Sequence, residues 1–109
     1  MNDMTDAQIS KALALAIGWQ ESDLYQGGDG SYVAVRRSGV FDTWKVFDYT
    51  DETVIWRVAE RFDCWPYLLT RDGTWRAVFK DRDGLYMTEA EADTAAKAVA
   101  LAVIAAHGG

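Results

Sequence analysis

Residues 50–62 read TDETVIWRVAERF, and this stretch carries the clearest helical pattern in the chain. Its apolar residues recur at the spacing of one helix face, which predicts a helix over residues 51–62 with Thr50 as the N-cap. Asp51 and Glu52 suit the first turn, because the positive end of the helix dipole stabilises carboxylates there. The face that this helix is expected to bury comprises Val54, Ile55, Val58, Ala59 and Phe62.

A strand hairpin is predicted on each side of this helix. Before it, residues 31–37 and 40–47 alternate apolar and polar side chains, with a tight-turn signal at Ser38-Gly39. After it, residues 67–70 and 74–80 are joined by an aspartate–glycine turn. Because side chains alternate along a strand, one face of each hairpin is expected to be buried. The residues expected on the buried face are Val33, Trp44, Trp75 and Phe79.

The N-terminal segment predicts a helix followed by a loop. Thr5 and Gln8 have the spacing of a capping box, and an apolar stripe continues over residues 6–17. Gly18 suits the position that ends such a helix, because glycine adopts the left-handed conformation without strain. Residues 21–30 contain several glycines but no phosphate-binding motif, so we expect a plain loop there.

The C-terminal segment predicts a second capped helix. Thr88 and Glu91 have capping-box spacing, which places this alanine-rich helix at residues 89–106. Residues 85–87 are a candidate fifth strand. The whole chain, 1–109, is expected to form a single domain with the order α-β-β-α-β-β-(β)-α. Its amphipathic strands predict an α+β fold, with one antiparallel sheet of four to five strands and three helices packed on its core side.

The composition argues against an enzyme. Cys64 and His107 are the only cysteine and the only histidine, so neither an intramolecular disulfide nor a catalytic triad is expected. We expect Cys64 to be a small core residue and His107 to lie in a frayed tail. Turn and cap positions account for the carboxylates, so no metal, cofactor or catalytic residue is predicted.

The charge of the chain is distributed unevenly. A net charge of −6 disfavours binding to nucleic acid or anionic lipid, although it leaves a local basic surface open. The two hairpin segments, residues 31–47 and 64–80, each carry three cations and one carboxylate, whereas the other segments are acidic. No leader peptide or membrane-spanning stretch is evident, which predicts a cytoplasmic protein with no membrane partner.

The hairpin cations are predicted to lie together on the sheet face away from the helices. Tyr32, Phe41 and Phe47 lie in the first of these segments, and aromatic residues among cations are typical of protein interfaces. A second interpretation is that the charges only keep the strand faces soluble and unpaired. The candidate binding residues are Arg36, Lys45, Phe47, Arg76 and Lys80.

Several cap and core residues occur in an order that is known from one family. Gly18-Trp19 follows the first helix, Tyr49-Thr50-Asp51 precedes the second, and residues 92–96 lead the last. With Trp56, Val58 and Glu60 on the second helix, the chain resembles the phage ABA sandwich domain family over most of its length. The resemblance implies a phage or prophage origin, an α+β fold and an accessory role, and it supplies no catalytic residues. The first hairpin occupies what looks like a variable spacer in that family.

Two functions from different classes fit these observations. The first is that of a phage accessory protein that binds stoichiometrically to a host protein, for example as an inhibitor of bacterial anti-phage defence of the anti-CRISPR kind. The second is a nucleic-acid or nucleotide binding module that stacks bases on the basic sheet face. For the first, we expect the interface on the basic sheet face; the acidic helices would instead suit mimicry of DNA. The sequence leaves the target and the oligomeric state open.

Overall fold

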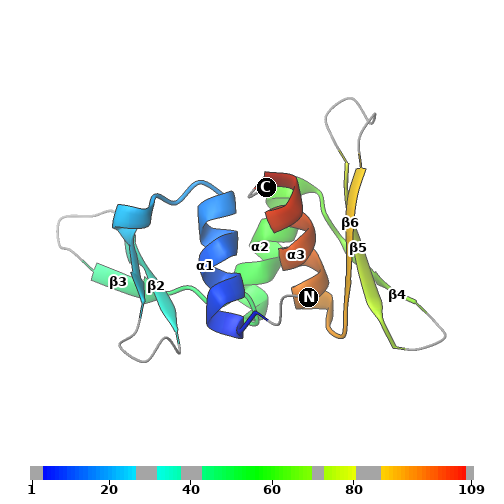
Figure 1. Cartoon of the computed structure of the whole chain (residues 1–109), viewed down its shortest axis with the longest axis horizontal. Coiled ribbons are helices and arrows are strands. Elements are labelled where there is room, and N and C mark those ends of the chain that lie inside the picture. Colours follow the sequence, from blue (N-terminus) through cyan, green and yellow to red (C-terminus); the bar gives the residue numbers. More distant parts are fainter. Residues whose placement is uncertain (1–3, 27–31, 38–42, 70–72, 81–86, 108–109) are drawn as a thin grey trace.

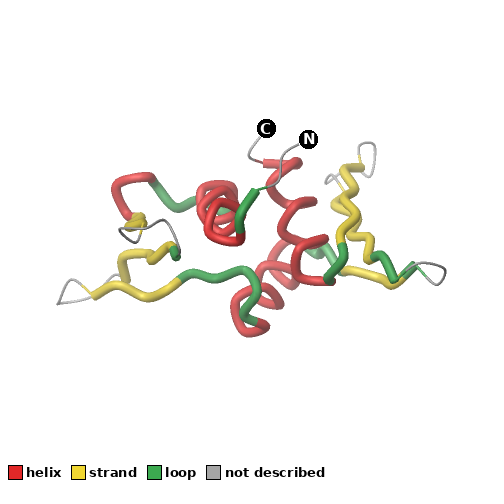
Figure 2. The backbone as a smooth tube through the Cα atoms, turned by 60° about the horizontal axis from the view of Figure 1, so that its bottom comes forward, coloured by secondary structure: helices red, strands yellow, loops and turns green. Residues whose placement is uncertain are grey.

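The chain folds into two β-sheets with three helices between them (Figure 1). The computed structural model describes residues 4–26, 32–37, 43–69, 73–80 and 87–107. Figure 2 shows the same arrangement as a backbone tube, with the three α-helices in the middle and strands at both ends; the short 3₁₀ helix Glu21–Asp23 lies beside sheet A. The predicted α+β class and the three helices are confirmed.

Helix α1 (Asp6–Ala16) begins and ends as its sequence predicts. Thr5 accepts a hydrogen bond from the backbone N–H of Gln8 at 3.2 Å, and Gln8 accepts one from the backbone N–H of Thr5 at 2.8 Å. This reciprocal capping box satisfies donors that have no partner within the helix. Gly18 follows the helix with a φ of +116°, and Trp19 then folds back against the core.

Helix α2 (Glu52–Phe62) is capped by Asp51 and not by the predicted Thr50. The Asp51 carboxylate accepts hydrogen bonds from the backbone N–H of Thr53 at 2.9 Å and from its hydroxyl at 2.8 Å. Thr50 instead donates its backbone N–H and its hydroxyl to Asp48, which closes the turn before the helix. Thr50 and Asp51 are both of types that cap helices, and the later residue, Asp51, is the N-cap in the structure.

The first sheet, called sheet A, consists of β1 (Leu24–Gln26), β2 (Val33–Arg37) and β3 (Thr43–Val46) in that order, all antiparallel. Strand β1 lies in the segment predicted to be a loop, so that prediction is wrong there. The predicted turn at Ser38-Gly39 lies outside the described residues. Residues 40–42 of the predicted second strand also lie outside the described residues, and from Thr43, which pairs with Arg37, the strand is as predicted.

The second sheet, called sheet B, consists of β4 (Pro66–Leu68), β5 (Trp75–Lys80) and β6 (Met87–Ala92) in that order, again antiparallel. Helix α3 (Ala95–His107) packs across all three strands. The helix was predicted to begin near Glu89, but that residue lies within β6. The last strand is therefore longer than the predicted fifth strand, and the last helix begins later.

The capping box predicted at Thr88 and Glu91 does not exist. Glu91 pairs directly opposite Arg76 in the sheet, and the two side chains form an ion pair. The hydroxyl of Thr94 caps the helix instead, since it accepts a hydrogen bond from the backbone N–H of Lys97 at 3.2 Å. The spacing Thr-x-x-Glu is compatible with a strand as well as with a helix start, and pairing with β5 selects the strand.

The prediction of one sheet of four to five strands is wrong, because the strands form two separate three-stranded sheets. Sheet A packs against α1, and sheet B packs against α3 (Figure 1). Helix α3 also contacts both other helices, so the helices form a middle layer. Each hairpin buries one face against this layer, from opposite sides.

One cluster of buried residues joins the helices to both sheets. Leu13, Ile55 and Val99, one from each helix, have no exposed surface, and neither has Cys64, which confirms it as a core residue. Small side chains on α3 allow its backbone to approach its neighbours closely. The fully buried alanines of α3 are Ala98, Ala100 and Ala102.

His107 does not lie in a frayed tail. It is the last residue of α3, and the centroid of its ring lies 5.0 Å from that of Phe62 and 5.0 Å from that of Phe79. The ring meets Phe79 edge to face, an arrangement that aromatic pairs favour. The end of α3 is thereby fixed to both α2 and β5.

Tyr49 fastens the segment between β3 and α2 to helix α1. Its backbone N–H donates to the hydroxyl of Ser10 at 3.1 Å, and its own hydroxyl donates to the carboxylate of Asp6 at 2.6 Å. Tyr49 and Ser10 are both buried, so these bonds satisfy groups that have left water. Burial and the bond to Asp6 raise the pKa of the Tyr49 hydroxyl well above its ordinary value.

Candidate interaction surface

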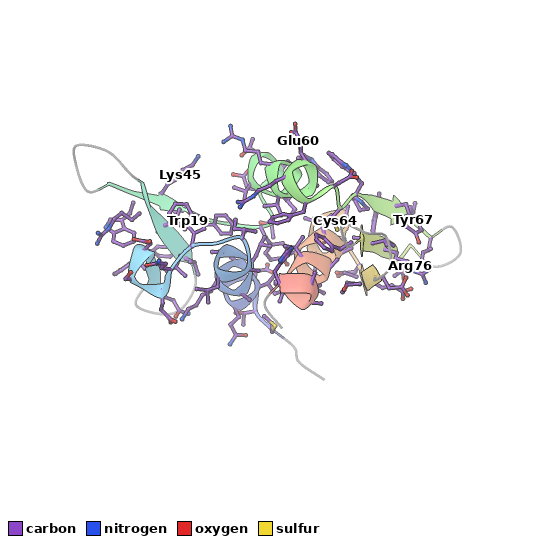
Figure 3. All side chains as sticks on the ribbon, turned by 90° about the horizontal axis from the view of Figure 1, so that it is seen from above. Trp19, Lys45, Glu60, Cys64, Tyr67 and Arg76 are labelled. Atoms are coloured by element: carbon purple, nitrogen blue, oxygen red, sulfur yellow. The ribbon has the colours of Figure 1, made fainter. Side chains whose placement is uncertain are left out.

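The predicted binding residues do not share one surface. The β2–β3 register pairs Arg36 with Trp44 and Val35 with Lys45. Directly paired residues project from the same face of an antiparallel sheet, so Arg36 and Lys45 lie on opposite faces of sheet A. Figure 3 shows Lys45 and Arg76 at opposite ends of the molecule, with the helices between them.

Phe47 and Arg76 are not free to form a basic surface. Phe47 is only 8 % exposed and belongs to the core. Arg76 is paired with Glu91, with 2.9 Å between the arginine Nε and the carboxylate oxygen, and hydrogen bonds to Glu91 and Tyr67 raise the pKa of Arg76 above its ordinary value. Lys80 ends strand β5, and its side chain lies outside the described part of the structure.

The predicted buried face of β3 is the exposed one. Because side chains alternate along a strand, Trp44 and Val46 lie on one face of β3, and Lys45 and Phe47 lie on the other. Alternation does not decide which of these two faces packs against the helices. The structure buries Phe47, whose backbone N–H donates to the carbonyl of Val33 at 2.8 Å, and leaves Trp44 exposed. In sheet B, by contrast, the predicted buried face with Trp75 and Phe79 is confirmed, and Ala77 lies buried between them.

Three large aromatic side chains gather on the face of sheet A that points away from the helices. The ring centroids of Tyr25 and Tyr32 are 6.4 Å apart, and those of Tyr25 and Trp44 are 5.9 Å apart. These side chains remain 50 %, 42 % and 44 % exposed, in the order Tyr25, Tyr32, Trp44. The guanidinium of Arg36 lies 5.5 Å from the Trp44 ring centroid, close enough for a cation–π interaction.

The aromatic side chains surround a shallow hollow. It has a volume of about 300 Å³, and Val46, itself 55 % exposed, completes its wall. Its floor is Ala34, which is nearly buried because the larger side chains stand around it. We call this surface the aromatic face, and it consists of Tyr25, Tyr32, Ala34, Arg36, Trp44 and Val46.

Sequence reasoning found only part of the aromatic face. Arg36 and Tyr32 were both predicted to be exposed near an interface, whereas Phe41, predicted beside them, lies outside the described residues. Tyr25 is absent from the predicted binding residues because its strand lies in a segment predicted to be a loop, and Trp44 is absent because it is predicted to be buried. Tyr25 and Tyr32 lie on either side of the glycine-rich segment, and β1 and β2, which flank it, pair antiparallel. This pair of tyrosines is the sequence signal that could have indicated the aromatic face.

Within the described residues, no group of three or more histidine, cysteine, aspartate or glutamate side chains is placed to hold a metal ion. Cys64 is fully buried, and burial raises the pKa of its thiol to about 11, which keeps it in the unreactive thiol form near neutral pH. None of the described helices has the length and apolar character needed to span a bilayer.

The aromatic face is the candidate site, because exposed aromatic side chains, a cation and a hollow meet there. A comparison with known families finds no family model that matches the chain, and a search of curated proteins finds no matching relative. Membership of the phage ABA sandwich domain family accordingly stays a prediction.

Proposed function

We propose that this protein acts by stoichiometric binding to another protein through the aromatic face of sheet A. The observation that carries the proposal is that Tyr25 lies beside both Tyr32 and Trp44, while all three aromatic side chains remain roughly half exposed. Tryptophan, tyrosine and arginine are the residues most enriched among interface hot spots, and all three types meet here.

The shape of the aromatic face supports protein binding further. The hollow over Ala34 offers a place for one side chain of a partner, and Arg36, whose guanidinium lies over Trp44 in the wall of the hollow, supplies a cation nearby. A desolvated pocket surrounded by aromatic rings is the usual setting of a hot spot. A contiguous exposed apolar surface also costs solubility in a free monomer, which favours its use as an interface.

The class of partner rests on the sequence resemblance. We propose a host protein as the target, with the chain acting as a phage accessory protein that inhibits anti-phage defence in the anti-CRISPR manner. The first hairpin occupies what looks like a variable spacer in that family, so we place the features that are specific to this chain there. Strands β2 and β3 of that hairpin carry Arg36 and Trp44. This part of the proposal is tested by the identity of the captured partner.

Nucleic acid is the alternative occupant of the aromatic face, because exposed rings stack on bases. A binding groove for the phosphate backbone also needs several cations, and Arg36 is the cation that the described residues place on this face. The net charge of −6 adds long-range repulsion. We therefore favour a protein partner.

The experiment is affinity capture from a bacterial lysate with tagged protein, comparing the parent chain with the double variant Tyr25→Ala plus Trp44→Ala. We expect the variant to lose its captured partner, with affinity weakened by a factor of about 30 or more, as truncation of hot-spot aromatics usually costs upward of 2 kcal/mol. Both residues are exposed, so the variant is expected to fold with an unchanged circular dichroism spectrum.

The matched control is Trp65→Ala. Trp65 is 50 % exposed and stacks on Trp56, with ring centroids 6.2 Å apart, but it lies after helix α2 and not on sheet A. Capture is expected to survive this change. Equal capture by the parent and the double variant would refute the proposed interface, and salt-dependent binding of single-stranded DNA that is lost in the double variant would favour the nucleic-acid alternative.

A further inference from the structure

A cleft between strand β3 and helix α2 combines an apolar floor with a cationic rim. It has a volume of about 430 Å³. Figure 3 shows Trp19 between sheet A and the helices, with Lys45 projecting from β3. The apolar floor includes Ile17, Trp19, Val35, Val54 and Val58, and the cations of the lining are Lys45, Arg57 and Arg61.

The helical repeat of α2 builds one wall of this cleft. Arg57 and Arg61 are four residues apart, so they project from the same side of the helix, one turn above the other. Val54 and Val58 form the neighbouring row, which turns inward and packs against the core. The helix thus presents two guanidinium groups beside an apolar strip, and Lys45 contributes an ammonium group from the opposite wall.

The positive charge of the cleft is not neutralised by its own lining. Among the residues that the structure describes, no carboxylate lines the cleft, and neither ion pair of that part of the chain involves its cations. Asp51 is near enough to Lys45 for the ammonium to contribute to lowering the Asp51 pKa, but hydrogen bonds from Thr53 are the larger cause and occupy that carboxylate. Arg61 lies over the ring of Phe62, with 5.0 Å to its centroid.

We propose that this cleft binds a small organic anion with an apolar body. The carboxylate, sulfonate or phosphate group of the ligand is held by Arg57, Arg61 and Lys45, and its apolar part contacts Trp19 and Val54. The volume lies within the range of small-molecule sites, which are largely apolar with a few convergent polar groups. Arginine suits this task, because its planar fork binds oxyanions in a bidentate manner. The cleft and the aromatic face meet at Val46, which lines both, but their cations lie on opposite sides of sheet A, Lys45 in the cleft and Arg36 on the aromatic face.

The test is a chemical-shift titration of labelled protein with 4-phenylbutyrate, which carries a carboxylate on an apolar body. We expect saturable changes at the Trp19 indole and at the methyl groups of Val54 and Val58. The neutral analogue 4-phenylbutanol, with the same apolar body, is expected to bind at least about tenfold more weakly. Inorganic phosphate alone is expected to bind equally weakly, because it lacks contacts with the floor.

Charge removal on the rim separates this proposal from non-specific binding. In the double variant Arg57→Gln plus Arg61→Gln, affinity for 4-phenylbutyrate is expected to fall about tenfold, while the melting temperature stays unchanged because both side chains are exposed. The matched control Arg36→Gln removes a cation from the other face of sheet A and is expected to leave affinity unchanged. Absence of saturable binding at millimolar 4-phenylbutyrate, equal affinity for the alcohol, or unchanged affinity in the double variant would overturn the proposal.

Discussion

At the scale of single residues, Tyr49 shows how one side chain joins distant parts of the chain. Its backbone bond to Ser10 and its hydroxyl bond to Asp6 both cross from the β3–α2 connection to helix α1. Without the bond to Ser10, the buried backbone N–H of Tyr49 would have no hydrogen-bond acceptor. Leaving a typical buried polar group unpaired in this way costs about 1–3 kcal/mol. The pair of bonds therefore fixes where helix α1 lies relative to sheet A.

Replacing Tyr49 with phenylalanine is expected to lower the free energy of unfolding by about 1 kcal/mol. The ring and its packing are retained, so the loss reports the hydroxyl bond to Asp6. Urea unfolding of the variant measures the change, and Tyr25→Phe, at an exposed site, serves as the control. If both variants unfold at the midpoint of the parent chain, the bond to Asp6 contributes nothing to stability.

Cys64 makes stability depend on pH on the alkaline side. Burial raises its thiol pKa from the ordinary 9.0 to about 11, so above pH 9.0 the unfolded chain releases a proton that the folded chain retains. Its contribution is complete below that pH and is lost as the pH rises toward 11. The urea midpoint is expected to be lower at about pH 10 than at about pH 8. The free energy of unfolding falls with a limiting slope of about 1.4 kcal/mol per pH unit for one group.

The variant Cys64→Ala isolates the thiol from other groups that titrate in alkali, Tyr49 among them. Its urea midpoint is expected to fall less steeply over the same pH interval than that of the parent chain. An identical slope in both proteins would show that the thiol has the same pKa in the folded and unfolded states. Near neutral pH, the variant is expected to be slightly less stable, because it leaves a small cavity.

Residue type alone could not predict which face of sheet A is buried. A lysine on the inward side of β3 and a tryptophan on the outward side oppose the usual hydrophobic pattern, and the parity prediction for Trp44 failed for that reason. Strand β3 is an edge strand, so Lys45 reaches past the core into the cleft while Phe47 fills the interior. Contacts between elements, and not alternation, decide such a case.

At the scale of elements, the start of helix α2 is set by hydrogen bonds that differ between adjacent residues. Replacing Asp51 with alanine is expected to lower the melting temperature by a few degrees, because it removes the acceptor for the Thr53 N–H. Thr50→Ala is expected to have the smaller effect, since Thr50 only donates to Asp48. Thermal unfolding followed by circular dichroism compares them, and a larger effect at Thr50 would mean that the helix begins one residue earlier.

Elements with strong local signals could be predicted from the sequence, and the others could not. Helix α1 has a complete capping box and a glycine at its end, and it was predicted almost to the residue. Strand β6 reads MTEAEA, which has high helical propensity, and only its pairing with β5 makes it a strand. Strand β1 is short and lies at a sheet edge, so its pairing partner is the sole evidence for it.

At the scale of the whole molecule, the three helices separate two sheets that the sequence predicted as one. Both hairpins have one apolar face, which is equally consistent with a shared sheet or with two sheets on opposite sides of a helical layer. The alanine-rich surface of α3 selects the second arrangement, since it packs on sheet B while contacting α1 and α2. The predicted basic surface was divided for the same reason, with its residues now distributed over both ends of the molecule.

The two sides of sheet A therefore have different proposed tasks. The aromatic face points away from the helices and suits a protein partner, whereas the cleft beside α2 suits a small anion. Binding at each is expected to be independent of charge changes at the other, because the sheet separates Arg36 from Lys45. None of these features follows from composition, which is acidic overall and average in apolar content.

The central claim, that a protein partner binds the aromatic face, is tested most directly by the indole N–H signals of the five tryptophans. These signals, assigned by single Trp→Phe variants, are followed while the captured partner is added. The prediction is a clear shift of the Trp44 signal, with Trp56, Trp65 and Trp75 unchanged. Shifts at Trp56 and Trp65 with Trp44 unchanged would contradict the account and place the interface beside helix α2.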